Sequence, residues 1–492
     1  MVEKRVREYE AVIGLEVHAE LQTNSKMFCA CRVVDSTTAA PNTAVCPVCA
    51  GMPGMLPVVN QRAVEYGVRV ALALGCQVNP TSIFARKNYF YPDLPKGYQI
   101  SQYEQPLAQH GRLTFLTSQG ERQARIRRVH LEEDTGKLTH VTREGESYTL
   151  VDLNRAGVPL LEIVTEPDLR SAEEVRACAA ALRSILRYLG VNSGDLEKGV
   201  LRIEPNISVR PVGVQQLGTR TEIKNLNSFR ALERAVAYEI QRQIGRLEQG
   251  QPVVQETVGW DDLRGVTFTQ RVKETEDDYR YFPEPDLPPL ALDPEWIEAL
   301  RASLPELAYA RFRRFQEQYG LSAYDAEVLV AERGVADYFE QAVAAAAGIS
   351  PKIVANWISG ELFALLNQAG QAIEACRVTP HALADLLQRI ANNEINQNTG
   401  KAVLAEMFAS GESAGEIVEK RSLRQVSDAA LIARLVEQIL AENPEQVTAY
   451  LKGKETVAQW FFGQVMRLTR GQANPQVVRE VLEQQLTTLK KQ

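Results

Sequence analysis

The chain has 492 residues, of which 45% are hydrophobic, so at roughly 100–200 residues per domain it should form two to four globular domains. Its formal net charge of −7 excludes a small basic nucleic-acid module, and any contact with RNA must come from local patches or partner subunits. No run approaches about 20 consecutive apolar residues, and no apolar signal core follows the charged residues 1–5, so we expect a cytoplasmic protein that does not contact a membrane.

The first part of the chain contains several strand patterns. Residues 11–21 alternate apolar and polar side chains, with Glu16 and His18 on the polar side. Residues 127–134 alternate in the same way, and residues 160–164 form a short apolar run that holds one acid. Such patterns predict strands with one buried face.

Two helices are expected among these strands. Residues 61–74 carry apolar side chains at helical spacing, with Asn60 as a cap and Gly75 as a stop signal. Residues 171–174 form a capping-box sequence, and an apolar helical stripe follows it up to Gly190. Strands interleaved with few helices favour an α+β fold over a doubly wound sheet.

The chain changes character near residue 290. The acidic, proline-rich residues 281–289 indicate the end of a first domain, and nearly everything after them has a helical period. We therefore predict domains at residues 1–292, 293–410 and 411–492. In residues 451–492, seven Lys/Arg stand against three Glu, and this excess of four positive charges suits contact with phosphates.

Four cysteines have the spacing of a metal site. They form a C-x-C pair and a C-x₂-C pair, Cys29, Cys31, Cys46 and Cys49. Two close pairs of thiolates can supply all four corners of a tetrahedral zinc site, which leaves no open position and so predicts a structural role. The alternative is a set of unlinked thiols. The other cysteines, which lie in apolar helical surroundings, are expected to be small core side chains: Cys76, Cys178 and Cys376.

Glu16 and His18 share one face of the first predicted strand. Residues i and i+2 of a strand lie about 6.5–7 Å apart, so both side chains can reach one cation between them. A Mg²⁺ ion needs further oxygen ligands from neighbouring strands, and the available acids are Glu132, Glu133, Asp134 and Glu162. The residues alone equally allow a solvated strand face without a function.

Several nucleotide and hydrolase motifs are absent from the sequence. There is no G-x-x-x-x-G-K-[ST] loop, so an ATP site cannot be of the P-loop type. Residues 411–415 match G-x-S-x-G, but a helical segment precedes them and no histidine follows. They are therefore expected to be a loop that ends a helix rather than a nucleophile elbow.

Long motifs in fixed order give the chain a resemblance to a known family. These motifs are VIGLEVH at 12–18, RKNYFYPD at 86–93, YQISQ at 98–102, HLEED at 130–134, VDLNR at 151–155, EIKNLNSF at 222–229, DYRYFPEPD at 278–286 and GQANP at 471–475. They resemble the B subunits (GatB) of the glutamyl-tRNA(Gln)/aspartyl-tRNA(Asn) amidotransferases over nearly the whole chain.

The resemblance implies a fold and an activity. The expected fold is a cradle with a mainly antiparallel sheet, similar to glutamine synthetase, then an all-α domain and a YqeY-like helical tail that engages tRNA. The expected partners are an amidase A subunit, which releases ammonia from glutamine, and a small C subunit. In the cradle, ATP with Mg²⁺ phosphorylates the side-chain carboxylate of Glu-tRNA(Gln) or Asp-tRNA(Asn), and ammonia then displaces the phosphate.

The resemblance also assigns roles to residues. Metal-binding positions of the family match Glu16, His18 and Glu133, with Glu162 as a further candidate acid. Polar positions near the ammonia channel match Lys87, Tyr89 and Lys96. The residues counted as catalytic are Glu16, His18, Glu133, Lys87 and Tyr89. Contacts to phosphate or ribose are expected from Lys224, Asn225, Asn227 and Arg280.

One position departs from the family pattern. The family usually has Arg-Cys-Asp-Ala-Asn-Ile-Ser where residues 202–208 read Arg-Ile-Glu-Pro-Asn-Ile-Ser, so a metal-binding role of Glu204 is left open. The four-cysteine motif occurs in only some members of the family and is complete here, which favours zinc. A non-catalytic, zinc-containing scaffold that binds tRNA for the amidase is the alternative hypothesis, and it predicts that the acids on the strands are dispensable.

Overall fold

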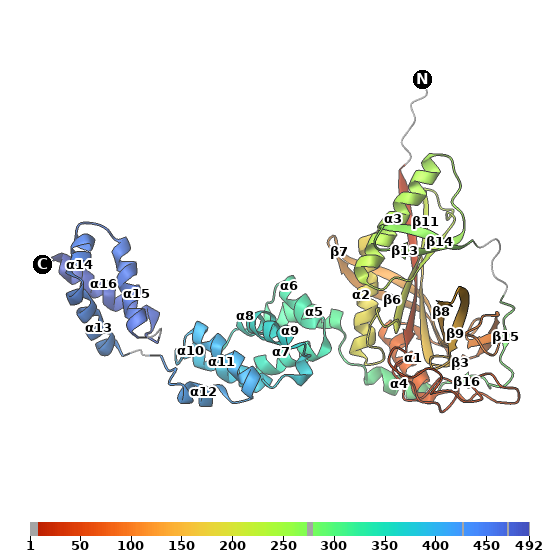
Figure 1. The fold of residues 1–492 in the computed structure, drawn as a ribbon, viewed down its shortest axis with the longest axis horizontal. Coiled ribbons are helices and arrows are strands. Elements are labelled where there is room, and N and C mark those ends of the chain that lie inside the picture. Colours follow the sequence, from red (N-terminus) through yellow and green to blue (C-terminus); the bar gives the residue numbers. More distant parts are fainter. Residues whose placement is uncertain (1–7, 273–278, 426–427, 470–471, 492) are drawn as a thin grey trace, which may run out of the picture. The chain divides into compact units, whose positions relative to one another are not determined.

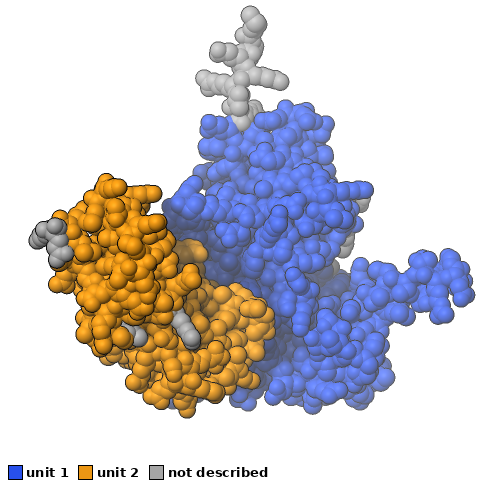
Figure 2. Space-filling model, turned by 60° about the vertical axis from the view of Figure 1, so that its left-hand side comes forward, with its two compact units in different colours: residues 1–310 blue, residues 311–492 orange. Residues whose placement is uncertain are grey.

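The computed structural model describes residues 8–272, 279–425, 428–469 and 472–491. The sequence features at residues 1–5, Asp278, Arg470 and Gly471 lie outside these ranges. The chain forms two compact units, residues 1–310 and residues 311–492, which Figure 2 shows in blue and orange. The division into three domains at residues 292 and 410 remains a prediction.

Within the described residues, unit 1 is built on a nine-stranded sheet with the order β14-β13-β12-β11-β1-β10-β7-β6-β2. All neighbouring pairs are antiparallel except β12 and β13, which confirms an α+β fold with a mostly antiparallel sheet. The strands are β1 (Tyr9–Glu20), β2 (Gln77–Val78), β6 (Ala108–Thr117), β7 (Gly120–Glu133), β10 (Pro159–Thr165), β11 (Leu201–Pro211), β12 (Thr221–Lys224), β13 (Glu256–Asp261) and β14 (Val266–Val272).

The hydrophobic core of unit 1 lies between this sheet and its helices. Leu15, Val17 and Ala19 of β1 are buried in one cluster with apolar side chains such as Val68 and Leu182 of the helices. Figure 1 shows two of these helices running side by side along the sheet. The helices are α1 (Gln61–Ala73), α2 (Ala172–Tyr188), α3 (Phe229–Glu248) and α4 (Pro294–Ala302). Alternation along β1 therefore leaves its even-numbered residues on the face away from the helices.

The helix boundaries follow the expected signals. Asn60 accepts hydrogen bonds from the backbone of Arg62 and Ala63 at the start of α1. Ser171 accepts one from the backbone N–H of Glu174, although the Glu174 carboxylate accepts from the N–H of Arg170 instead of closing the capping box. These caps satisfy N–H groups that have no partner within the helix.

The described part of unit 1 also contains three small sheets: β15–β4–β5, β16–β3 and β8–β9. Their strands are β3 (Thr81–Ser82), β4 (Ala85–Asn88), β5 (Tyr98–Ser101), β8 (Lys137–Arg143), β9 (Glu146–Asp152), β15 (Phe282–Pro283) and β16 (Leu290–Ala291). The proline-rich residues 281–289 thus begin with a strand that pairs with β4. Arg86 of β4 donates two hydrogen bonds to the buried carboxylate of Glu284, which fixes this segment to unit 1.

Unit 2 is helical throughout its described residues. α5 (Ala308–Tyr319) crosses the boundary between the units, and the later elements are α6 (Ala323–Val330), α7 (Arg333–Ala345), α8 (Pro351–Asn356), a π-helix (Trp357–Leu362), α9 (Phe363–Ala369), a 3₁₀-helix (Ile373–Ala375), α10 (Pro380–Ala391), α11 (Gln397–Ser410), α12 (Ala414–Lys420), α13 (Ala429–Glu442), α14 (Pro444–Leu451), α15 (Thr456–Leu468) and α16 (Pro475–Lys491). The last group, α13, α15 and α16, has its own apolar core.

Two sequence features of this half have a clear structural outcome. Gly411 ends α11 with a φ of 80°, and Ser413 caps α12 in a reciprocal capping box with Glu416, so the G-x-S-x-G match is a loop between helices. Cys376 follows the 3₁₀-helix and is only partly buried, unlike Cys76 and Cys178, which are buried as expected.

Among the described residues, no helix has the length and apolar character needed to cross a membrane.

We predict that the sheet core of unit 1 is sensitive to cavities. Leu161 of β10 is fully buried in the core, so Leu161→Ala should lower the free energy of unfolding of unit 1 by about 2–5 kcal/mol. Amide hydrogen exchange of β1 and β10 measures this change, because core strands open with the global free energy. The control is Leu150→Ala on β9, where the side chain is 54% exposed and the effect should stay within about 0.5 kcal/mol. Equal effects would contradict this placement of the core.

Candidate functional site

A row of ionisable side chains crosses the sheet on the face away from the helices. His18 of β1 lies directly opposite Glu162 of β10, and Glu162 lies opposite His130 of β7. Glu16 and Glu132 are two residues away from His18 and His130 along the same strands, so they share this face. Two antiparallel registers therefore bring side chains from three strands, β1, β10 and β7, into one row.

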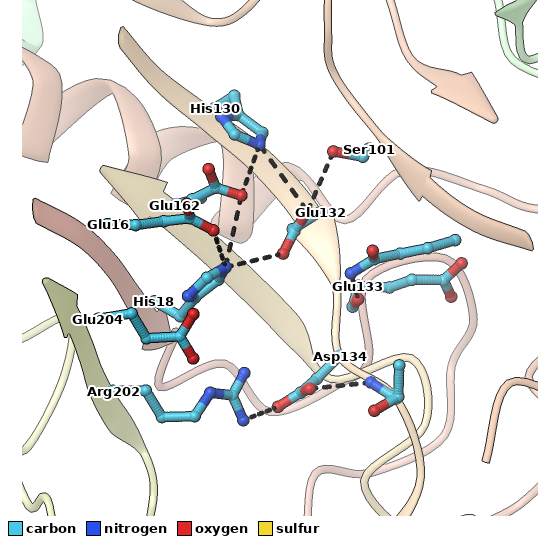
Figure 3. A network of polar contacts seen from close by, with 12 residues as sticks. Glu16, His18, Ser101, His130, Glu132, Glu133, Asp134, Glu162, Arg202 and Glu204 are labelled. Carbon is cyan, nitrogen blue, oxygen red and sulfur yellow. Dashed lines mark hydrogen bonds and ion pairs between the residues drawn. The ribbon is translucent and has the colours of Figure 1, made fainter. Parts of the chain in front are cut away.

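These five residues form one compact glutamate–histidine cluster, which Figure 3 shows. The Nε2 atom of His18 lies 3.7 Å from Glu16, 3.4 Å from Glu162 and 3.7 Å from Glu132. The Nε2 atom of His130 lies 3.2 Å from Glu162 and 3.8 Å from Glu132. Possible metal-ligand atoms converge in two triads, Glu16–His18–Glu162 and His130–Glu132–Glu162.

Burial, and the charges and hydrogen bonds between members of the cluster, shift the pKa values of its side chains. Burial alone would lower the pKa of His18, but the hydrogen bond and charge of Glu162 raise it to about 9. Burial would raise the pKa of Glu162, yet the two imidazoles hold this pKa well below its usual value. Burial and the charge of Glu162 raise the pKa of Glu16. A protonated His18 thus compensates the carboxylates, and a cation that binds to its Nε2 atom must displace a proton.

The row continues across β11 and β12. Glu16 lies opposite Glu204 of β11, and the Nζ atom of Lys224 on β12 lies 3.0 Å from Glu204 and 3.2 Å from Glu222. Burial would lower the pKa of Lys224, but these two carboxylates raise it. Glu204, which departs from the family pattern, therefore reaches a lysine in this structure.

A large cavity lies over the row. It has a volume of about 1270 Å³, and its lining includes Glu16 and Glu162 together with the predicted residues Lys87, Lys224 and Arg280. Further lining residues that the sequence did not single out are cationic, aromatic or hydrogen-bonding: Ser101, Tyr103, Arg127, Arg128, His130, Arg220, Glu222, Tyr279 and Tyr281. The cavity thus combines carboxylates at one place with several lysines and arginines around them, which suits a polyphosphate and its cation.

Some predicted residues lie beside the cavity rather than in its lining. The Tyr89 hydroxyl lies 3.5 Å from Gln99, and the ring of Tyr89 lies 5.9 Å from the Nζ atom of Lys87. Asn225 follows β12 with a φ of 62°, a left-handed conformation that asparagine tolerates better than most residues. Their proposed roles in catalysis and in ligand binding remain predictions.

Glu133 does not join the glutamate–histidine cluster. Consecutive residues of a strand face opposite sides, so Glu132 contacts the histidines while Glu133 forms an ion pair with Lys96 and accepts a hydrogen bond from the backbone N–H of Ile100. Glu133 is only 3% exposed. The groups of converging ligand atoms among the described residues include Glu132 and not Glu133, and the metal-binding role of Glu133 remains a prediction.

The four cysteines of the C-x-C and C-x₂-C pairs form a cysteine knuckle. Their sulfur atoms all lie within 4.8 Å of one another, and the Sγ atoms of Cys46 and Cys49 are 3.9 Å apart. A hydrogen bond with Cys29 lowers the pKa of Cys49 to about 4, with help from the Cys46 backbone and the charge of Lys26. Four converging sulfurs, one of them readily ionised, are the ligands that a tetrahedral zinc site requires.

Two neighbours connect this knuckle to the rest of the unit. Lys26 is only 1% exposed, and its Nζ atom lies 3.5 Å from the Cys49 sulfur and donates to the Leu153 carbonyl. Gly51 has a φ of 67° and lies so close to Lys96 that a Cβ atom there would be 2.7 Å from the lysine side chain. The knuckle thus packs directly against the Lys96–Glu133 ion pair.

Comparisons with known proteins agree with this architecture. Residues 11–298 match the family model described as the GatB/GatE catalytic domain, and residues 337–486 match the one described as the GatB domain. The chain is 53% identical to a protein of Thermomicrobium roseum over 97% of its length and 99% of that protein. It is also 53% identical to one of Moorella thermoacetica, over 97% and 100% of the two chains. Both relatives are named as the B subunit of aspartyl/glutamyl-tRNA(Asn/Gln) amidotransferase.

We predict that the Lys96–Glu133 pair is a stability determinant of unit 1. Lys96→Met keeps most of the aliphatic stem that packs on Gly51 but leaves the buried carboxylate of Glu133 without its cation, which should cost about 3–5 kcal/mol. Adding Glu133→Gln to this variant should restore a large part of the loss, because the uncompensated charge is then removed. Thermal unfolding of the single and double variants measures both effects. Arg62→Met breaks an exposed pair with Glu65 and should cost at most about 1 kcal/mol; a comparable cost for Lys96→Met would contradict the assignment.

Proposed function

Since this chain belongs to the family of aspartyl/glutamyl-tRNA(Asn/Gln) amidotransferase B subunits, we propose that its large cavity activates the side-chain carboxylate of Glu-tRNA(Gln) or Asp-tRNA(Asn) with ATP and then amidates it. It is accordingly a component of a carbon–nitrogen ligase. The observation that carries the proposal is the glutamate–histidine cluster at the edge of a cavity lined by lysines and arginines.

The chemistry explains why such a cavity is needed. Ammonia cannot displace oxide from a free carboxylate, because oxide is a poor leaving group. In the proposed first step, an oxygen of the substrate carboxylate attacks the γ-phosphorus of ATP, and ADP leaves. Ammonia then attacks the acyl carbon, phosphate leaves with the electron pair of the C–O bond, and the nitrogen loses a proton to give the amide. Both steps require that negative charge on phosphate oxygens is balanced and that the reactants are held in line.

The residues of the cavity fit these requirements. Arg127, Arg128 and Arg220 can contact phosphate oxygens, and we propose the same role for Lys224 and Arg280, which were expected to bind phosphate or ribose. Burial would lower the pKa of Lys87, but the charge of Glu132 raises it above the usual lysine value, so Lys87 stays a cation beside the cluster. It is then placed to attract an anionic group into the cavity.

We propose that Glu16, His18 and Glu162 hold Mg²⁺, because their ligand atoms converge in one triad. Bound Mg²⁺ would neutralise charge on the phosphates during phosphoryl transfer. Two carboxylates and one imidazole leave room for water and phosphate oxygens, which a six-coordinate cation requires. Zn²⁺ is proposed for the cysteine knuckle, where four sulfurs leave no position for a substrate.

Partners complete the proposal. The ammonia would come from glutamine through an amidase A subunit, with a small C subunit joining the amidase to this chain, and Lys87, Tyr89 and Lys96 would lie near the route of ammonia into the cavity. The cradle is proposed to share the fold of glutamine synthetase, the helical unit and its YqeY-like tail to contact tRNA, and the complex to work in the cytoplasm. The charge excess in residues 451–492 supports tRNA contact.

We predict that amidation depends on the acids of the cluster. The complete complex receives ATP, Mg²⁺, ammonium and Glu-tRNA(Gln), so glutaminase activity is not required. Glu16→Gln should lower the rate of Gln-tRNA formation about 100-fold or more, because several kcal/mol of charge stabilisation are lost, while tRNA binding persists. Glu10→Gln, at the far end of the same strand and paired with Arg210, is the matched control and should retain the wild-type rate.

The same assay separates the proposal from its alternative. A non-catalytic, zinc-containing scaffold that binds tRNA predicts that Glu16→Gln and Glu10→Gln amidate equally well. That outcome would overturn the carboxylate-activating role. If the wild-type complex binds but never amidates either Glu-tRNA(Gln) or Asp-tRNA(Asn), the proposed reaction itself is wrong.

We further predict one tightly bound zinc per chain. Cys46→Ser and Cys49→Ser should each lose this zinc and lower the melting temperature of unit 1, because binding free energy of a structural metal contributes to folding. Metal analysis of the purified chain by mass spectrometry measures the zinc content. Cys178→Ala, which alters a buried cysteine of α2 away from the knuckle, should keep the zinc. A zinc-free wild-type chain, prepared in medium that contains zinc, would contradict the prediction.

A further inference from the structure

The cysteine knuckle borders a second, smaller cavity of unit 1. This cavity has a volume of about 200 Å³, and two residues of the knuckle, Cys29 and Cys49, belong to its lining. Met52 and Met55 also line the cavity, and they are 57% and 48% exposed, so the cavity reaches the molecular surface. A small neutral molecule can therefore enter from solvent and contact two of the proposed zinc ligands.

We propose that this cavity makes the cysteine knuckle a modification site for hydrogen peroxide: the peroxide joins Cys29 and Cys49 in a disulfide, and the knuckle then loses its zinc. Thiolates are the nucleophilic form of cysteine, and their exposure determines which of them react. The knuckle meets this condition because Cys29, Cys31 and Cys46 are only partly buried. In a reducing compartment, such a disulfide is typical of a redox sensor rather than of a permanent cross-link.

The reaction balances with peroxide as the only oxidant. The Cys49 thiolate attacks one oxygen of hydrogen peroxide, the O–O bond breaks and hydroxide leaves, which gives a sulfenic acid at Cys49. The Cys29 thiolate then attacks the Cys49 sulfur, the S–O bond breaks and a second hydroxide leaves. Two protons from solvent convert the hydroxides to water. One peroxide is thus reduced for each pair of thiolates that is oxidised to a disulfide.

The geometry of the knuckle favours this pair of cysteines. All four sulfur atoms lie within 4.8 Å of one another, and Cys29 and Cys49 share a hydrogen bond. A small shift therefore brings their sulfurs to the bonding distance of about 2.05 Å. Cys46 also contacts Cys49, but the lining of the cavity includes Cys29 and not Cys46. Peroxide that enters through the cavity thus reaches Cys29 and Cys49 first.

Formation of the disulfide should release the zinc. An oxidised knuckle keeps only Cys31 and Cys46 as thiolates, whereas a structural zinc site requires four ligands. Because binding of a structural metal contributes to folding, this part of unit 1 should also become less stable. Reduction of the disulfide restores the ligands, so the modification should be reversible.

The cavity also connects the knuckle to the Lys96–Glu133 ion pair, since both residues of the pair line it. Gly157 lies between the two features: a Cβ atom there would be 3.4 Å from the Cβ atom of Cys49 and 3.9 Å from the Oε2 atom of Glu133. Oxidation of Cys49 should therefore loosen the ion pair. A consequence for amidation, through the proposed ammonia route near Lys96, rests on the proposed function, but the oxidation does not.

The experiment uses the purified full chain with zinc in its knuckle. During a titration with hydrogen peroxide, a chromogenic chelator measures the released zinc, and mass spectrometry of peptides locates disulfides and methionine sulfoxides. We expect loss of the zinc together with a Cys29–Cys49 disulfide, while the buried Cys76 and Cys178 stay reduced. A reductant and added zinc should then restore the original zinc content.

Two variants of one loop test whether peroxide enters through the cavity. Met52→Trp enlarges a side chain of the lining and should slow zinc release severalfold. Leu56→Trp enlarges a side chain that is 62% exposed and lies in the same loop outside the lining, so it should react at the wild-type rate. Both variants keep all four cysteines of the knuckle, and their zinc content before oxidation shows whether the knuckle has folded.

Each outcome decides the proposal. Zinc that stays bound at peroxide concentrations that oxidise Met52 to its sulfoxide overturns it, because the bound metal then protects the sulfurs. A disulfide that omits Cys29 or Cys49 also overturns it, as do equal rates of zinc release from zinc-loaded Met52→Trp and Leu56→Trp. If a variant binds no zinc, the wild-type zinc release and disulfide decide alone. If the amidation assay fails while the disulfide forms, the modification site stands and the proposed reaction falls.

Discussion

The register of four antiparallel strands, β11–β1–β10–β7, is the constraint on which the site depends. Every second residue of β1 is apolar and packs against the helices, so the residues between them must face away. Pairing with β10 then places Glu162 opposite His18, and pairing with β7 places His130 opposite Glu162. The hydrophobic pattern that folds the sheet thus also positions the ionisable groups, without any loop or insertion.

The buried charges of the site are compensated by neighbouring groups of opposite charge. Glu162 lies between two imidazoles, Glu204 and Glu222 contact Lys224, and Glu133 contacts Lys96. An isolated buried charge would cost several kcal/mol, and pairing with good geometry removes most of that cost. Several lysine and arginine side chains also line the cavity, so an anionic ligand in the cavity would lie among positive charges.

The sequence predicted the helix boundaries well, but it predicted only some of the contacts between distant segments. Periodicity and capping residues located α1 and α2 because such signals act within a few positions. Alternation placed Glu16 and His18 on one face of a strand, but it does not reveal which residues of neighbouring strands lie beside them. The sequence therefore did not identify Glu132, rather than Glu133, as the acid that contacts the histidines. Arg220 reaches the cavity from a segment without a recognisable pattern, and Tyr281 lies in a matched motif to which no role was assigned. Only the fold brings both residues to the cavity. The family resemblance added Lys224 and Arg280 through matched motifs.

The same alternation determines which sequence changes this unit can accommodate. A deletion of one residue inside β1 would shift everything beyond it by one position and exchange the two faces, placing Glu16 and His18 among the helices and apolar side chains over the cavity. A substitution in a strand changes one side chain, whereas a change in strand length moves every side chain beyond it to the other face. Among the strands that the structure describes, β8 and β9 pair only with each other, so lengthening or shortening their turn at residues 144–145 leaves the register of the nine-stranded sheet unchanged. Variation in chain length among relatives should accumulate at such self-paired hairpins and not within the strands that carry the site.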